Sequence, residues 1–260
     1  MFDINNFVID RIVRGVALSQ KDDSVLFSIN QIQNASLNCA SESTDAVDAM
    51  GTPIATFYRA KSAEFSAENA LFDMNLMATQ LGTEKKVASS TSKITVPAME
   101  SFVAEGTTYE LKHVPTGAIK EIYVLNNDST FGTKYTVETE AGESVFSIDG
   151  QTITLPTNVK TGAEMFVMYE YETDKAVEVI NSAKNFPVGC KFVMEVLGCD
   201  VCDQTNLVYA YVIFNNAKLS PDFDWSIATD GTHPFSMKAQ QDYCDREKKL
   251  FSIIIPGDEE

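Results

Sequence analysis

Leu207-Val208-Tyr209-Ala210-Tyr211-Val212-Ile213-Phe214 is the longest strongly apolar run in the chain. Aromatic and β-branched residues dominate it, which is typical of a β-strand. Both alternating faces of such a strand are apolar, so we expect a central strand covered on both sides or a strand in a subunit contact. The run is far too short to cross a bilayer as a helix. It therefore predicts a buried strand, and similar runs of aromatic and β-branched residues recur along the chain.

Most of the remaining sequence also predicts β structure. Asp149-Gly150 is the strongest short-range hairpin signal, and turn residues such as Asn126-Asn127-Asp128 and Thr161-Gly162 recur at the spacing of a sandwich. The expected strands are Val25–Ile29, Ile54–Arg59, Thr108–Leu111, Ala118–Leu125, Tyr135–Glu138, Val145–Leu155, Met165–Tyr171, Ala176–Ile180, Lys191–Leu197 and Leu250–Ile255. The chain is thus predicted to be mainly β, and residues 106–174 could fold as a small sandwich of their own.

One helix is expected, from Glu68 to Leu81. Its apolar residues fall at i, i+4, i+7 and i+11, which predicts a buried core face made of Ala70, Met74, Met77 and Leu81. Ser66 is the expected N-cap, and Gly82 follows as a left-handed C-terminal cap. By contrast, the polar stretch Asn38–Asp48 predicts a long loop that ends at the turn signal Gly51-Thr52-Pro53.

The charge is strongly unbalanced, with 37 acidic residues against 20 basic ones and a net charge of −17. An acid excess of this size repels polyanions and favours solubility. Basic residues do not cluster, and Lys85-Lys86 and Lys248-Lys249 are isolated pairs, so specific binding to nucleic acid is not supported. The N-terminal residues lack a basic region followed by an apolar stretch, so no signal peptide is expected. An odd count of five cysteines then favours reduced thiols in a cytosolic setting.

The sequence offers no catalytic constellation and no cofactor motif. His113 and His233 do not form a metal-binding pattern, and there is no glycine-rich phosphate loop. Gly142-Glu143-Ser144 continues into Val145-Phe146 and lacks the second glycine of a nucleophile elbow. Paired carboxylates could serve a hydrolase, but a solvated surface explains the acids better. We therefore expect a protein that is not an enzyme and needs no cofactor.

Two further groups of residues allow a functional reading. Four thiolates could build a structural zinc site, and the candidates are Cys190, Cys199, Cys202 and Cys244. Only one Cys-x-x-Cys knuckle is present, however, so ordinary thiols are favoured over zinc. Trp225 could act as a sugar platform, although anchoring a loop to a core or a neighbour explains it better.

Two stretches together resemble structural proteins of tailed bacteriophages. The first is Phe57–Phe72, a strand running into the expected helix, and the second is Ser226–Phe235 with the closing strand Leu250–Ile255. The chain is most similar to tail tube (major tail) proteins over residues 1–105 and 175–260. The resemblance implies a discontinuous β-sandwich or half-barrel domain with one packed helix, made of 1–105 and 175–260. Residues 106–174 would be an inserted, small Ig-like β-sandwich.

The resemblance also implies how the protein works. Six copies would join their sheets into a ring with a continuous inner barrel, and rings would stack into a tube through loops and terminal arms. The polar segment containing Ser41, Glu42, Ser43, Thr44 and Asp45 would be the inter-ring contact. Such a protein is made in the host bacterial cytoplasm and resides in the tail of the virion. Its partners would be its own copies and tail proteins such as sheath or terminator, with DNA passing through unbound and no membrane involved.

Three alternatives remain open at this point. A capsid decoration or baseplate protein would share the β texture but bind a preformed structure. A carbohydrate-binding or adhesion module is suggested by aromatic residues of the middle block, namely Tyr123, Tyr135, Phe146, Tyr169 and Tyr171. A hydrolase with paired carboxylates is the third.

Overall fold

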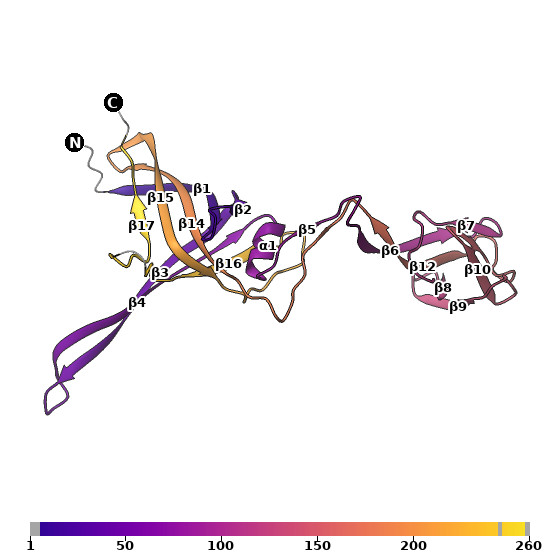
Figure 1. Cartoon of the computed structure of the whole chain (residues 1–260), viewed down its shortest axis with the longest axis horizontal. Coiled ribbons are helices and arrows are strands. Elements are labelled where there is room, and N and C mark those ends of the chain that lie inside the picture. The colour runs from indigo at the N-terminus through magenta and orange to yellow at the C-terminus, as the bar shows by residue number, and fades with distance from the viewer. Residues whose placement is uncertain (1–5, 244–245, 258–260) are drawn as a thin grey trace. The chain divides into compact units, whose positions relative to one another are not determined.

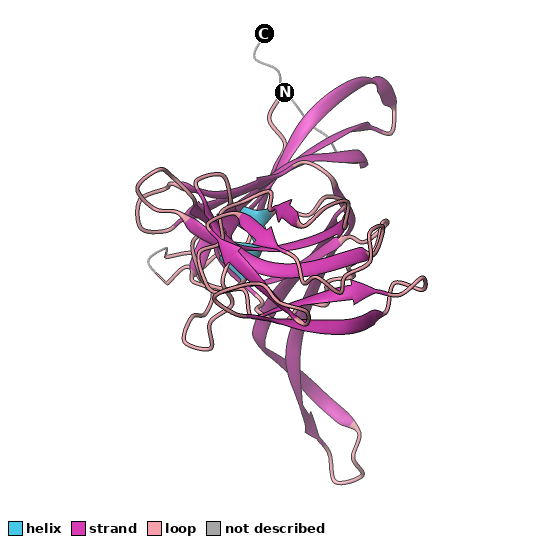
Figure 2. Ribbon diagram, turned by 90° about the vertical axis from the view of Figure 1, so that its right-hand side faces the viewer, coloured by secondary structure: helices cyan, strands magenta, loops and turns pink. Residues whose placement is uncertain are grey.

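The computed structural model describes residues 6–243 and 246–257. Strands dominate it, and the described residues contain a single α-helix (Figure 2). The chain forms two compact units. The split unit is built from residues up to Lys85 and from Val179 onward, and the inserted unit is Lys86–Glu178. The prediction of a mainly β protein is confirmed.

The split unit is one antiparallel sheet of eight strands. Its strands are β1 (Phe7–Ser19), β2 (Val25–Ile29), β3 (Ile32–Val47), β4 (Pro53–Asn69), β14 (Gly189–Asp200), β15 (Asp203–Leu219), β16 (His233–Ala239) and β17 (Ser252–Ile254) (Figure 1). They are ordered β2-β1-β14-β15-β16-β4-β3, and β17 pairs with β15. The sheet curls into a half-barrel around an aromatic core. The ring centroid of Phe65 lies 5.9 Å from those of Phe192 and Phe214, and 6.0 Å from that of Phe235.

The apolar run 207–214 lies in β15, where it pairs with β14 from Val208 to Phe214 and with β17 from Tyr211 to Ile213. It is central, as predicted, but it is not covered on both faces. Ala210 and Phe214 are buried in the core, whereas Leu207 and Tyr209 remain 48% and 46% exposed. A half-barrel has a single core, so it buries only the concave face of its strands.

The helix is shorter than the sequence predicts. Helix α1 spans Met74–Gln80, and its N-cap is Asp73, whose Oδ1 accepts a hydrogen bond from the Leu76 backbone N at 2.7 Å. The predicted N-cap Ser66 lies in β4 instead, opposite Ser236 of β16. Alternate residues of β4, Ala63, Phe65, Ala67 and Asn69, are buried. This period of two, supported by pairing on both sides, prevails over the local helical spacing.

The predicted helical face is therefore only partly correct. Met77 is buried and Met74 and Leu81 are half-buried, but Ala70 precedes the helix and is exposed. The residue that anchors α1 in the half-barrel core is Leu76, which is fully buried. The packed helix and its C-terminal glycine are confirmed, because Gly82 adopts a φ of +66°. A Cβ at Gly82 would lie 2.3 Å from the Phe186 backbone, so only glycine fits.

The inserted unit has its own sheet and core. Its strands are β5 (Lys86–Val87), β6 (Ile94–Val103), β7 (Thr108–Glu110), β8 (Glu121–Leu125), β9 (Phe131–Val137), β10 (Val145–Asp149), β11 (Thr152–Thr154), β12 (Glu164–Thr173) and β13 (Val177–Glu178). Seven are ordered β6-β12-β8-β9-β10-β11-β7, while β5 pairs with β13. Asp149-Gly150 turns β10 into β11, with Gly150 at φ +58°, which confirms the hairpin.

The inserted unit begins earlier than residue 106, the first residue of the predicted insertion. Strand β6 belongs to this unit because it pairs with β12 along its whole length, from Ile94 opposite Thr173 to Val103 opposite Glu164. The core residues include Ile122, Phe146, Ile153, Met165 and Val167, all fully buried. The Ig-like description of this unit stays a prediction.

Candidate assembly surface

The β3–β4 hairpin is the most exposed element of the split unit. Its strands pair from Ile32 opposite Asn69 out to Val47 opposite Pro53. Asp48 closes the tip, because its Oδ1 accepts hydrogen bonds from the backbone N atoms of Met50 and Thr52, both at 2.8 Å. The turn is confirmed at Gly51, which adopts a φ of +87°, whereas Pro53 is already the first residue of β4.

The loop predicted over Asn38–Asp48 is wrong, because most of this segment is strand β3. The candidate contact residues Ser41–Asp45 lie on the hairpin, where Thr44 faces Phe57 and Asp45 faces Thr56. Thr56 Oγ1 donates a hydrogen bond to Asp45 Oδ1 at 2.7 Å. Both faces of this two-stranded ribbon are exposed to solvent, so its strands need no alternation of apolar and polar residues. The alternation that usually predicts a strand is therefore missing from its sequence.

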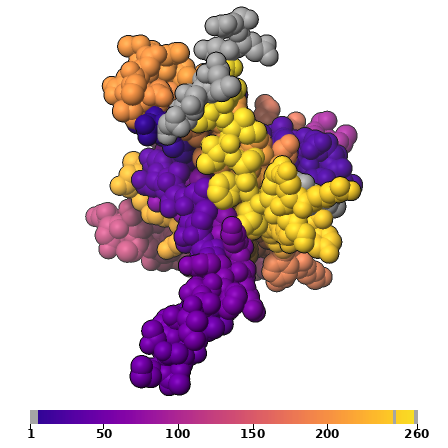
Figure 3. Space-filling view, turned by 90° about the vertical axis from the view of Figure 1, so that its left-hand side faces the viewer, coloured from indigo at the N-terminus to yellow at the C-terminus, as the bar shows by residue number. Residues whose placement is uncertain are grey.

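The outer part of the hairpin carries apolar side chains that the chain itself does not cover. The large ones are Val47, Met50, Ile54, Phe57 and Tyr58, which are 54%, 88%, 72%, 55% and 72% exposed. In the space-filling view the hairpin, in purple, projects away from the rest of the split unit (Figure 3). Exposed apolar groups of this kind are typical of surfaces that contact another molecule, so the hairpin tip is a candidate interaction site.

Free strand edges accompany these side chains. Strand β4 pairs with β16 only from Glu64 to Asn69, so its outer part has a partner on one side only. Strand β3 pairs with β4 alone within the described residues. Strand β1 pairs with β2 only from Gly15 to Leu18, which leaves the edge of Phe7–Arg14 open in the described chain. Unpaired N–H and C=O groups at such edges are templates for pairing with another chain.

An apolar groove lies where these edges approach each other. Residues of β1 and β3 form part of its lining, and its volume is about 440 Å³. The large apolar lining residues are Ile9, Ile12, Ile32, Leu37, Phe65, Met194, Val196, Val212 and Ile253. The half-barrel core is thus open toward solvent between two strands that are not joined by a ladder.

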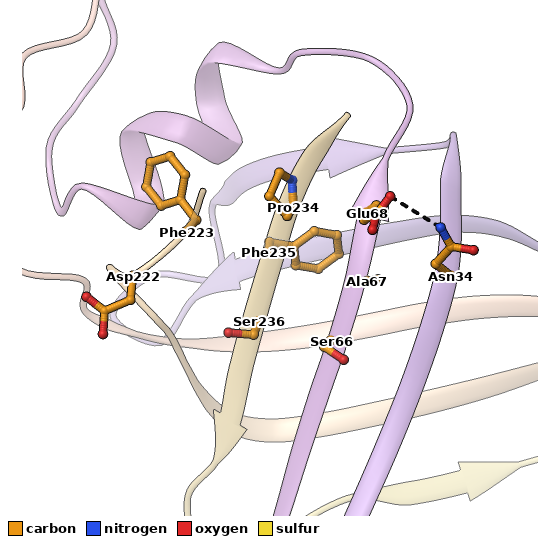
Figure 4. A pocket seen from close by; sticks show the side chains of 9 residues that line it. All are labelled: Asn34, Ser66, Ala67, Glu68, Asp222, Phe223, Pro234, Phe235 and Ser236. Carbon is orange, nitrogen blue, oxygen red and sulfur yellow. Dashed lines mark hydrogen bonds between the residues drawn. The ribbon is translucent and has the colours of Figure 1, made fainter. Parts of the chain in front are cut away.

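A smaller hollow lies beside β4 and β16 (Figure 4). Glu68 is held there, because its Oε2 accepts hydrogen bonds from Asn34 Nδ2 at 3.2 Å and Thr232 Oγ1 at 3.1 Å. Asp222 stands apart from Glu68 on the far side of the hollow (Figure 4). These two carboxylates do not form the acid pair that the hydrolase alternative requires, and Glu68 instead ties β3 and the segment before β16 to β4.

His233 is fully buried and supports α1. Its Nδ1 accepts a hydrogen bond from the Asp73 backbone N at 3.3 Å, so its Nε2 carries the proton and donates to Gln80 Oε1 at 2.8 Å. Burial lowers the pKa of His233, which keeps the ring neutral. Phe72 stacks on His233 and Trp225 stacks on Phe72, with centroids 5.2 Å and 4.4 Å apart. Trp225 therefore anchors its loop.

The structure does not bring the candidate zinc ligands together. Cys190 and Cys199 lie near opposite ends of β14, about 30 Å apart along the strand. Cys202 is exposed in the following turn, and Cys244 lies outside the described residues. Burial raises the pKa of the Cys190 thiol to about 11, so this sulfur is a poor thiolate ligand. The described residues contain no group of three or more metal-ligating side chains placed to hold a metal ion.

The aromatic residues suggested for carbohydrate binding mostly belong to the core of the inserted unit. Tyr135, Phe146 and Tyr169 are at most 5% exposed, and Tyr171 stacks on His113. Tyr169 Oη donates a hydrogen bond to the buried carboxylate of Glu100. The predicted set therefore cannot act as a platform, and only Tyr123 remains on an outer face. No sequence signal separated inward from outward aromatics.

The chain matches a known protein family. The YomU/Tube protein family matches residues 7–250, and the chain belongs to this family. This confirms the resemblance to phage tail tube proteins, a class of structural proteins of the virion. No curated protein matches the chain. Within the described residues, no helix is long and apolar enough to span a membrane.

Proposed function

We propose that this protein assembles with copies of itself into rings that stack to form a phage tail tube. The observation that supports this most directly is the β3–β4 hairpin, with its exposed apolar side chains and its free strand edges. Tube-family membership agrees with self-association. The resemblance to tail tube proteins suggests six copies in each ring.

The free edges suggest how copies join side by side. The open edge of β1, along Phe7–Arg14, and the outer edge of β3 are different surfaces of the same molecule. A contact between different surfaces is heterologous, so it closes into a ring or continues as a filament. Ladder pairing between such edges would extend the sheet from copy to copy and would also cover the apolar groove between β1 and β3.

The hairpin is the proposed contact between rings. Ser41–Asp45 and the apolar tip residues lie on the same projecting ribbon, so the hairpin could make both polar and apolar contacts with the next ring. Other tail proteins, such as sheath or terminator, would bind the assembled tube. The finished structure would reside in the virion tail, after synthesis in the host cytoplasm.

The charge suits a conduit for DNA. Each phosphate contact made by a lysine or arginine adds affinity through release of counterions, so a wall that lets DNA slide must avoid such contacts. Instead of attracting phosphates, a chain with a net charge of −17 repels DNA. The proposed role is structural and requires no catalysis and no cofactor.

Electron microscopy and sedimentation of the purified protein test this proposal. We expect rings or tubes, favoured at high salt because screening weakens repulsion between acidic copies. A variant in which a short turn replaces residues 42–59 should form rings that do not stack. A protein that stays monomeric at about 0.15 M and about 1 M salt, at every concentration tested, would contradict the proposal.

A further inference from the structure

The inserted unit has an aromatic groove on the outer face of its sheet, defined by Tyr123, Phe131, Phe166 and Met168. Phe131 and Met168 are 59% and 52% exposed, and the other two are half-buried. The ring of Phe131 lies 4.9 Å from that of Tyr123 and 5.1 Å from that of Phe166, centroid to centroid. Neither the family match nor the proposed tube accounts for this groove.

The sheet holds these rings in place. Phe166 of β12 lies opposite Tyr123 of β8, while its chain neighbours Met165 and Val167 point into the core and are fully buried. Phe131 comes from β9, opposite Leu125 of β8. Because alternate residues of a strand face opposite sides, burial of Met165 and Val167 fixes Phe166 outward. The platform is therefore built on paired strands and needs little ordering when a ligand binds.

Polar groups of fixed position border the rings. Glu121 lines the groove, and its carboxylate accepts hydrogen bonds from Tyr123 Oη at 2.5 Å and from Lys134 Nζ at 2.9 Å. These two bonds lower the pKa of the Glu121 carboxyl, so it remains an ionised acceptor. Lys120 supplies a further donor to the lining. The groove has a volume of about 610 Å³, within the usual range for a small-molecule site.

We propose that the aromatic groove binds a neutral saccharide chain. Sugar rings present C–H groups on their faces, and these carry the positive polarity that the negative face of an aromatic ring attracts. Their hydroxyl groups both donate and accept, which matches Glu121 and Lys120. This combination of an apolar platform with a few placed polar groups is what orients a ligand in a small-molecule site.

The charges favour a neutral ligand over the alternatives. Glu121 is balanced by Lys134, and Lys120 is the remaining cation in the lining. A polyanion would be repelled by a chain of charge −17, and a cationic ligand would meet Lys120. The inference does not depend on the proposed tube, because every residue of the site lies within the inserted unit.

Isothermal titration calorimetry of the full chain with maltohexaose, cellohexaose and chitohexaose tests the proposal. We expect saturable binding of at least one of them, weakened about tenfold by Phe131→Ala. Val114→Ala is the matched control, because Val114 is 62% exposed in the same unit but does not line the groove. The control should bind like the unchanged protein, and both variants should keep its thermal unfolding midpoint.

Two results would overturn the proposal. One is absence of binding to all three oligosaccharides, or binding that Phe131→Ala and Glu121→Gln leave unchanged. The other is loss of a protein–protein contact on Phe131→Ala, seen as a smaller particle in sedimentation, which would assign the groove to a protein partner.

Discussion

Replacing Ile54 by aspartate should weaken stacking through the hairpin at least tenfold without unfolding the protein. Ile54 is 72% exposed, so most of its side chain is available for burial in a contact between copies. Full burial of an isoleucine side chain contributes about 1.5–3 kcal/mol, so this contact should gain about 1–2 kcal/mol from Ile54. Aspartate removes that gain and adds the cost of burying a carboxylate. Since about 1.4 kcal/mol is a factor of ten, each contact should weaken at least tenfold.

The measurement is the protein concentration at which stacked particles first pellet, determined by sedimentation and checked by electron microscopy. Ile54→Asp should raise this concentration at least tenfold, while the free energy of unfolding from urea titration stays unchanged. Val114→Asp, at a comparably exposed position in the inserted unit, serves as the control. If Ile54→Asp remained folded and stacked at the unchanged concentration, the hairpin would not be the contact between rings.

Three predictions concern stability. Burial lowers the pKa of His233, so below about pH 6.5 the unfolded chain binds a proton that the folded chain does not bind. The free energy of unfolding should therefore be full above about pH 6.5 and decrease below it. His233→Gln should reduce this decrease, measured by urea titration at about pH 7.5 and 5.5. Gly82→Ala should lower the free energy of unfolding by at least about 2 kcal/mol, because left-handed backbone costs about 1–2 kcal/mol and the Phe186 backbone clashes with the new Cβ. Gly51→Ala, also at positive φ but in open space, should lose only the backbone contribution. Equal losses of unfolding free energy in the two variants would contradict the clash with Phe186. Phe146→Ala should lower the unfolding free energy by about 3–5 kcal/mol, since Phe146 is fully buried in the inserted unit, and a loss below about 1 kcal/mol in calorimetry would mean that the core is not as described.

Local signals in the sequence were sufficient where neighbouring residues decide the structure. Asp149-Gly150, Gly51 and Gly82 lie where the sequence predicted turns or a helix end, because positive φ values favour glycine whatever the rest of the fold. The mainly β character also followed from composition and alternation. The helix began too early in the prediction, because Glu68 and Asn69 fit the helical spacing as well as the strand that β3 and β16 complete.

The candidate site was predicted only in part. Ser41–Asp45, which the sequence predicted as an inter-ring contact, are exposed, and that role stays a prediction. Their strand pairing and the apolar side chains of the hairpin tip were not recognised as one surface. In the inserted unit, Tyr135 and Phe146 were grouped with Tyr123, although the structure buries the first two and exposes Phe131 beside the third. Aromatic content alone does not reveal which face of a strand meets the core.

By itself, the sequence determined the β class, the acidic charge, the sharp turns and the family, because these depend on composition and on short stretches of chain. The tertiary structure alone decided that 38–47 is a strand, that β6 belongs to the inserted unit, and which edges of β1 and β3 stay open. These features depend on pairing between residues far apart in the chain. The apolar run 207–214 shows both sides of this division: its residues specify a strand, but the curvature of the half-barrel decides that one face is buried and the other remains partly exposed.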